Sequence, residues 1–141
     1  MFLADLTSHP YIKSVNGQTA LCIGWLDKEH PYPTGKSNSD FLVKLTQFCC
    51  HPVFMTLGYH TPNLGNETQE IVISFKGKKR ILGAGHTLIF GNFYTFIIPD
   101  LICYYVEHYH YLPPDEFIEA VYHCPLPDTP EYQVCSQDWG L

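Results

Sequence analysis

The chain has 141 residues, of which 45% are hydrophobic and 16% are charged, and this balance suits one globular domain. Its net charge of −6 and pI of about 5.6 argue against a nucleic-acid partner, because nucleic-acid binders present a basic face. Because the N-terminus lacks a signal-peptide pattern and no apolar run approaches the ~20 residues of a membrane span, we expect a cytoplasmic protein that contacts no membrane.

The first half of the chain predicts one strand and one helix. Residues 1–18 are polar and are expected to be irregular. Residues 20–25 are apolar on both sides, which is typical of a strand that packs on two faces. After a proline-rich loop, a helix is expected to begin near Ser37 or Ser39, because either hydroxyl can accept a hydrogen bond from a free amide group. Its apolar residues recur at helical spacing: Phe41, Leu42, Leu45, Phe48 and Cys49.

The second half predicts two hairpins and two helices. Residues 53–57 form a candidate strand, and a loop follows it. Alternating apolar residues at 71–75 lead into a Lys-Gly-Lys turn, and residues 88–96 contain a Gly-Asn pair that suits a tight hairpin. Pro99 suits the first turn of a helix, and Asp115 is expected to open a second, shorter helix.

Together these elements indicate an α+β fold in a single domain, residues 1–124. We expect a mostly antiparallel sheet of about four or five strands, with one mid-chain helix and two C-terminal helices. Residues 125–141 are Pro-rich and are expected to form an extended C-terminal tail. Two interpretations of the tail stay open: it is a docking segment with Trp139 as its anchor, or it lies over the protein's own core.

The eight histidines and six cysteines raise the question of a metal site, but their spacing does not favour one. Zinc ligands usually come in pairs at short spacing, such as Cys-x-x-Cys. Cys49, Cys50 and His51 are consecutive, so a helix would point them in different directions. We therefore predict no metal, no cofactor and no catalytic residue. In a reducing compartment the cysteines are expected to be free thiols.

Several short segments form a wider pattern. They are Gly24-Trp25-Leu26, Gly58-Tyr59-His60, Ile98-Pro99-Asp100-Leu101-Ile102, Tyr105-Val106, His108-Tyr109-His110-Tyr111 and Pro113-Pro114-Asp115-Glu116-Phe117-Ile118-Glu119-Ala120-Val121. In these segments the chain resembles a widespread family of small uncharacterised bacterial proteins, which has no established activity. Many members carry Cys-x-x-Cys after Gly-aromatic-His, a metal-binding arrangement. Pro62 and Gly65 stand at those positions here, so the resemblance implies a fold but not that metal site.

A polar, aromatic patch is the candidate binding surface. It would combine the loop after Gly58 with residues 108–111, where we expect His108 and Tyr111 to stay accessible. The alternative is structural: Gly58 permits an unusual backbone and His60 bonds a loop carbonyl. With the tail included, the candidate binding residues are Tyr59, His60, His108, His110, Tyr111 and Trp139.

Small size, acidic balance, many aromatic residues and the lack of a motif favour a protein that binds another macromolecule and is not an enzyme. We expect a protein partner, and an immunity-type inhibitor of a basic toxin is one form of this hypothesis. The alternative is a small metal-binding or hydrolytic domain that uses His60 with His86, or with His108 and His110.

Overall fold

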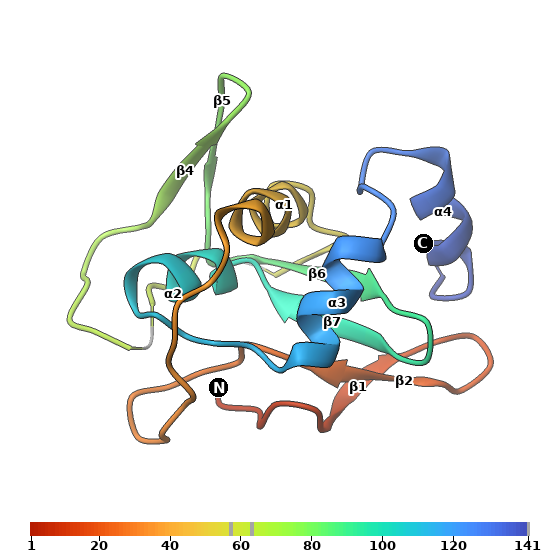
Figure 1. The fold of residues 1–141 in the computed structure, drawn as a ribbon, viewed down its shortest axis with the longest axis horizontal. Coiled ribbons are helices and arrows are strands. Elements are labelled where there is room, and N and C mark those ends of the chain that lie inside the picture. Colours follow the sequence, from red (N-terminus) through yellow and green to blue (C-terminus); the bar gives the residue numbers. More distant parts are fainter. Residues whose placement is uncertain (57, 63, 141) are drawn as a thin grey trace.

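The computed structural model describes residues 1–56, 58–62 and 64–140. In these residues four helices accompany a five-stranded sheet and a separate two-stranded arm (Figure 1). In chain order the elements are β1 (Ser8–Lys13), β2 (Thr19–Cys22), α1 (Ser39–Cys49), β3 (Phe54–Met55), β4 (Val72–Phe75), β5 (Lys78–Ile81), β6 (Gly85–Phe90), β7 (Thr95–Pro99), α2 (Ile102–His108), α3 (Asp115–His123) and α4 (Pro130–Gln137). None of the helices described is long and apolar enough to cross a membrane.

The five-stranded sheet has the order β1-β2-β7-β6-β3. β6 and β7 form the hairpin predicted around the Gly-Asn turn, with Ile89 opposite Phe96. β2 and β7 run parallel, whereas the other neighbouring strands run antiparallel. The chain continues beside β7 after β2 ends, since the N–H of Ile23 donates to the carbonyl of Ile97 at 3.2 Å. The predicted α+β fold with a mostly antiparallel sheet is confirmed.

Both faces of the sheet are buried, because alternate residues of β6 and β7 enter two different hydrophobic clusters. One cluster joins Ile89 and Phe96 to helices α1 and α3. The other joins Leu88 and Ile97 to Trp139 in the C-terminal segment. The sheet is therefore the middle layer of the molecule.

Helix α1 shows how a local pattern leads to a helix with one buried face. Phe41, Leu45 and Phe48 are buried, as their helical spacing predicts. The helix begins at Ser39, but the capping side chain is that of Asn38, which accepts a hydrogen bond from the N–H of Asp40 at 2.9 Å. The predicted caps Ser37 and Ser39 were therefore wrong, by one residue in either direction.

The segment predicted to be irregular, residues 1–18, contains the edge strand β1. His9 is its only fully buried residue, so the strand shows no apolar alternation. Pairing with β2 orders it, with Ser8 opposite Leu21 and Lys13 opposite Thr19. Because this strand is stabilised by hydrogen bonds to the backbone of its neighbour, its own sequence needs no apolar pattern from which it could be predicted.

Pro99 ends strand β7 instead of beginning a helix, and α2 starts at Ile102. Pro99 lies opposite His86, at the last rung of the β6–β7 ladder. A proline is tolerated there because its missing amide hydrogen interrupts no further pairing. The predicted strand over residues 53–57 is shortened to β3, and Leu57 lies outside the described residues.

Within the C-terminal segment 125–141, which was predicted to be extended, Pro130–Gln137 form helix α4. The hydroxyl of Thr129 accepts a hydrogen bond from the N–H of Tyr132 at 3.3 Å, and Pro130 occupies the first turn. Tyr132 and Trp139 are only 2% and 7% exposed. In the described chain the segment therefore adds a third C-terminal helix, and it covers the protein's own sheet.

Candidate functional site

Segments far apart in the sequence meet at a cavity of about 300 Å³ next to Trp25. They are the Gly-Trp-Leu segment, the loop that carries His60, strand β6 and the junction of β7 with α2. Their residues in the cavity wall are Gly24, Trp25, Leu26, His60, His86, Pro99, Asp100 and Leu101. Apolar walls with a few polar groups are typical of a small-ligand site.

Gly24 allows the backbone to bend sharply at the cavity wall. Its φ is +82°, and a Cβ atom there would lie 2.6 Å from Cδ1 of Ile102. Its N–H donates to Oδ1 of Asp5 at 3.0 Å, and Oδ2 of the same carboxylate accepts from the hydroxyl of Tyr111 at 2.6 Å. Asp5 therefore connects the Gly-Trp-Leu segment to Tyr111, which lies in the segment after α2.

His86 packs a neutral imidazole against Trp25 in a T-shaped arrangement. The two ring centroids are 4.7 Å apart, and the rings are inclined by 65°. Burial, followed by the nearby His9 and His60, lowers the pKa of His86 to about 4. Within the described part of the chain, neither ring nitrogen of His86 has a hydrogen-bond partner. At neutral pH the ring therefore offers one donor and one acceptor to a molecule in the cavity.

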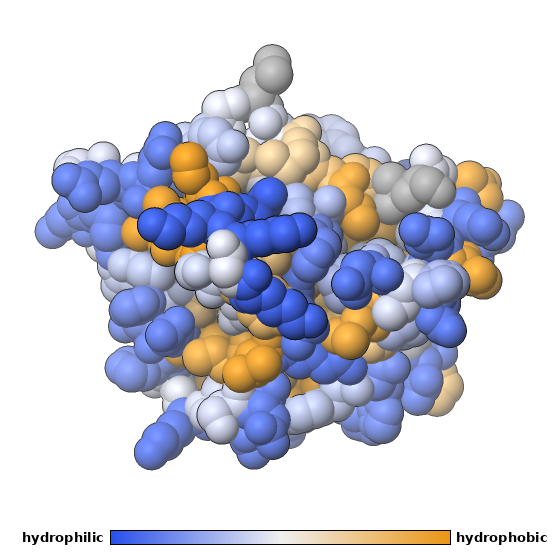
Figure 2. All heavy atoms as spheres, turned by 90° about the horizontal axis from the view of Figure 1, so that it is seen from above, coloured by the Kyte–Doolittle hydropathy of each residue, from blue (hydrophilic) through white to orange (hydrophobic). Residues whose placement is uncertain are grey.

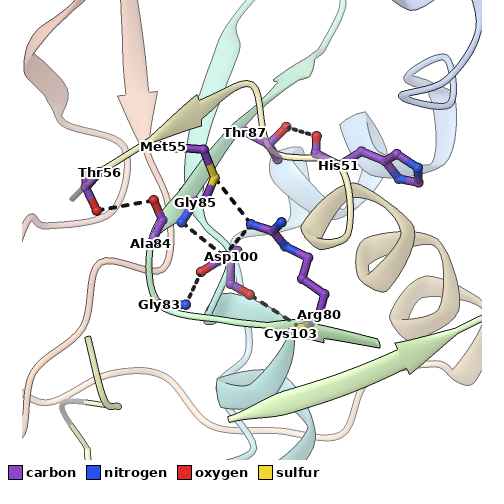
Figure 3. A network of polar contacts seen from close by, with 10 residues as sticks. All are labelled: His51, Met55, Thr56, Arg80, Gly83, Ala84, Gly85, Thr87, Asp100 and Cys103. Atoms are coloured by element: carbon purple, nitrogen blue, oxygen red, sulfur yellow. Dashed lines mark hydrogen bonds and ion pairs between the residues drawn. The ribbon is translucent and has the colours of Figure 1, made fainter. Parts of the chain in front are cut away.

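Asp100 lines the cavity and links three segments (Figure 3). Its Oδ1 accepts from the N–H of Gly83 at 2.8 Å. Its Oδ2 accepts from the N–H of Gly85 at 3.1 Å and from Nη2 of Arg80 at 3.3 Å. Burial nevertheless raises the pKa of Asp100. Because three donors engage the carboxylate, its geometry is that of a structural link and not of a free general base.

The close approach around Asp100 depends on glycine at position 85. A Cβ atom there would lie 2.9 Å from Oδ2 of Asp100 and 2.7 Å from Nη2 of Arg80. It would also lie 2.7 Å from the side chain of Pro52. Arg80 and Asp100 cannot move away without breaking the contacts that place the carboxylate, so the site requires this glycine.

The histidines of the cavity and the six cysteines are the residues available for metal or thiolate chemistry. His60 and His86 line the same cavity, but in the described ranges no group of three or more His, Cys, Asp or Glu is placed to hold a metal ion. All six cysteines are free. Burial raises the pKa of Cys22 and of Cys124 to about 11, so both thiols are protonated at neutral pH. These two residues are therefore not activated nucleophiles.

The structure divides the six candidate binding residues into two groups. The exposed residues are Tyr59, His60, His108 and His110. Tyr111 and Trp139 are buried, with exposed fractions of 0% and 7%. The expectation that Tyr111 stays accessible was wrong, because its hydroxyl is satisfied inside the protein by the carboxylate of Asp5. That partner lies at the other end of the chain, where no local pattern can reveal it.

The loop after Gly58 does reach the end of α2, but through Glu67 and not through His60. The hydroxyls of Tyr104 and Tyr109 both donate to Oε1 of Glu67, at 3.3 Å for Tyr104. These bonds, that of Tyr109 first, lower the pKa of Glu67. Sequence reasoning missed this residue, because a glutamate in a polar loop carries no distinguishing signal.

The β6–β7 turn forms a second surface that was not predicted. Phe93 and Tyr94 are 86% and 56% exposed. They border a hollow of about 130 Å³ whose other wall includes Glu116 and Glu119 of α3. We call these four residues the acidic aromatic surface. The sequence pattern that could have indicated this surface is two consecutive aromatic residues after a Gly-Asn turn. The same pattern is also typical of the start of a strand, so it did not predict exposure.

Comparison with known proteins gives a family but no activity. No curated protein and no solved structure matches the chain. One family model, described as a domain of unknown function, matches residues 1–122. The match includes the whole sheet, the arm, α1, α2 and nearly all of α3, whereas α4 lies beyond it. The chain therefore belongs to this family of domains of unknown function, DUF7919.

Proposed function

We propose that this protein acts by binding another protein, and that the acidic aromatic surface is its contact site. The observation that carries the proposal is Phe93, which is 86% exposed beside Glu116 and Glu119. Aromatic anchors of this kind dominate the binding energy of protein interfaces. Burying a phenylalanine contributes about 1.5–3 kcal/mol, and folding of this chain leaves that contribution unused at Phe93.

The charges beside the two rings indicate a basic partner. Glu116 and Glu119 lie on α3 at the edge of the hollow. The net charge of −6 adds a long-range attraction for a basic protein and would speed its association. A toxin with a basic active site is one such partner, and a protein that covers that site would act as an immunity protein.

Site-specific photo-crosslinking tests this proposal. Tyr94 is replaced with the photoreactive residue p-benzoylphenylalanine, and the protein is irradiated in an extract of its native host. We expect one dominant adduct, with a basic protein, because position 94 would lie inside the interface. Excess wild-type protein should compete for the adduct, whereas Glu119→Lys protein should compete about tenfold less well, since it places like charges opposite each other.

The matched control carries the same photoreactive residue at Tyr11, which is 81% exposed on β1. Identical adducts from positions 11 and 94 would contradict the proposal. Competition by Glu119→Lys as strong as that of the wild type would contradict it as well. The yield of the adduct should also fall as the salt concentration rises beyond about 0.1 M, where exposed charges are screened.

The cavity beside Trp25 supports a second candidate function, the binding or turnover of a small molecule with His60 and His86. The observation that favours it is the imidazole of His86, which lacks a hydrogen-bond partner among the described residues and faces a cavity of about 300 Å³. Elemental analysis of protein purified without a tag tests the metal-binding form. Bound metal that is lost in folded His60→Ala protein would favour it. Metal-free protein whose His86 ring resonances respond to no compound of a fragment set would rule out this function.

A further inference from the structure

Half of the positive charges of this acidic chain lie within five residues. Lys76, Lys78, Lys79 and Arg80 are four of its eight Lys and Arg residues. They belong to the arm formed by β4 and β5, which is a separate sheet and rises beside α1 (Figure 1). Figure 2 shows the molecule from the side on which the arm rises, and long, strongly hydrophilic side chains crowd there beside hydrophobic ones.

The register of the arm places basic side chains on the face that is turned toward the body of the protein. Phe75 lies opposite Lys78, and Ile73 lies opposite Arg80. Directly opposed residues of an antiparallel pair share a face, and so do alternate residues of one strand. Phe75, Lys78 and Arg80 therefore share one face. That face is the inner one, because Arg80 bonds the buried Asp100.

A cleft of about 300 Å³ separates this face from the end of α1 and the residues after it. Its lining includes Gln47, Cys50, His51, Lys78, Arg80 and Asp128. The arm contributes four positive charges around the cleft, and the carboxylates of Asp128 and Asp100 offset two of them. The cleft is therefore a basic pocket in a protein whose net charge is −6.

The guanidinium of Arg80 is held in place, but not all of its N–H donors have hydrogen-bond partners among the described residues. Its Nη2 lies 3.3 Å from Oδ2 of Asp100 and 3.5 Å from Sδ of Met55 (Figure 3). Its Nε is buried and has no hydrogen-bond partner in the described part of the chain. A guanidinium presents five donors in a planar fork. Arg80 is therefore a pre-positioned cation with donors left for an anionic ligand.

We propose that this cleft binds a small molecule that carries a phosphate group. A phosphate monoester has a charge of about −1.5 to −2 near neutral pH, which matches the two surplus positive charges. The fork of an arginine suits two phosphate oxygens, and a lysine supplies a point charge beside it. The size of the cleft, about 300 Å³, suits a small molecule better than a polymer.

Protection of strand edges is the other known role of lysine on such an arm. It accounts for the exposure of Lys76 and Lys79 at the turn and along β5, although both residues also line the cleft. It does not account for Lys78 and Arg80, which share the inner face with the cleft. Nor does it account for the buried, unpartnered Nε of Arg80. The inner pair therefore supplies the placed donors of the proposed site, and Lys76 and Lys79 on the cleft lining supply its surplus positive charge.

Titration of ¹⁵N-labelled protein with pyrophosphate tests it. We expect saturable shifts of the backbone amides at residues 76–80 and 47–51, with a dissociation constant below about 10 mM. Lys78→Gln should weaken binding about tenfold, the loss expected for one charge-assisted hydrogen bond. Lys13→Gln, at an exposed lysine of β1, should leave the affinity unchanged. Unchanged shifts elsewhere in the spectrum show that each variant is folded.

Comparison with ATP separates the two sources of a phosphate group. Affinity for ATP equal to or below that for pyrophosphate assigns recognition to the phosphates alone, and tighter binding of ATP extends it to a nucleotide. Three results would overturn the proposal: no saturation below about 10 mM pyrophosphate, citrate binding as tightly, or equal weakening by Lys13→Gln and Lys78→Gln. Tighter binding of an RNA oligonucleotide than of ATP would also overturn it.

Discussion

Replacing Asp100 with asparagine tests whether the carboxylate holds the cavity wall together through its acceptor oxygens. The amide nitrogen of asparagine cannot accept a hydrogen bond. In either orientation it therefore faces the N–H of Gly83 or of Gly85, which loses its acceptor. One buried donor without a partner costs about 1–3 kcal/mol, and loss of the charge-assisted bond from Arg80 adds about 1 kcal/mol. We expect the free energy of unfolding to fall by about 2–4 kcal/mol.

The pH dependence separates the lost hydrogen bonds from the lost charge. Burial raises the pKa of Asp100 above its ordinary value of 3.8, and this effect outweighs the bonds from Gly83, Arg80 and Gly85. The folded state therefore binds more protons than the unfolded state between pH 3.8 and the raised pKa. The resulting stabilisation is complete below pH 3.8 and is lost as the pH rises through the raised pKa. Because asparagine does not titrate, the difference between Asp100→Asn and wild type should be largest at acid pH.

Urea unfolding, followed by circular dichroism and tryptophan fluorescence, measures both effects. Asp138→Asn is the control, because Asp138 is exposed at the end of α4 and its replacement should change stability by less than about 0.5 kcal/mol. If Asp100→Asn is as stable as Asp138→Asn at every pH, the network in Figure 3 does not stabilise the fold and the reasoning is refuted.

Three further substitutions test other contacts. Gly24→Ala should lower the free energy of unfolding in urea by about 3 kcal/mol or more, because its new Cβ would lie 2.6 Å from Ile102. Gly17→Ala is its control: Gly17 has the same φ of +82° but open space around it, so the loss should be about 1–2 kcal/mol. Trp139→Ala should lower the free energy of unfolding by about 3–5 kcal/mol in the same assay. A loss below about 1 kcal/mol would show that packing of the C-terminal segment on the sheet does not stabilise the fold. Because the pKa of His86 is lowered from 6.5 to about 4, the folded state binds fewer protons than the unfolded state in that range. Stability should therefore fall by about 2 kcal/mol as the pH drops from 6.5 to 4, and His86→Gln should remove most of this slope.

Elements with a regular apolar period were predictable from the sequence. Helix α1 buries Phe41, Leu45 and Phe48, and the β6–β7 hairpin has a Gly-Asn turn between two apolar runs. Each signal depends only on residues close together in the chain. Helix α4 gives a weaker signal, since it buries only Tyr132 and Ser136 along its length. It is ordered by the sheet that it covers, as β1 is ordered by β2.

The amino-acid order alone determined the α+β class, the acidic balance and the residues available for chemistry. Only the tertiary structure decided that Gly24, His60 and Asp100 share one cavity wall. It also decided that Tyr111 is buried against a distant carboxylate while Phe93 stays in solvent. The physical reason is that burial of one side chain depends on what packs over it from elsewhere in the chain. Local periodicity reports which face of an element is apolar, but not which partner reaches that face.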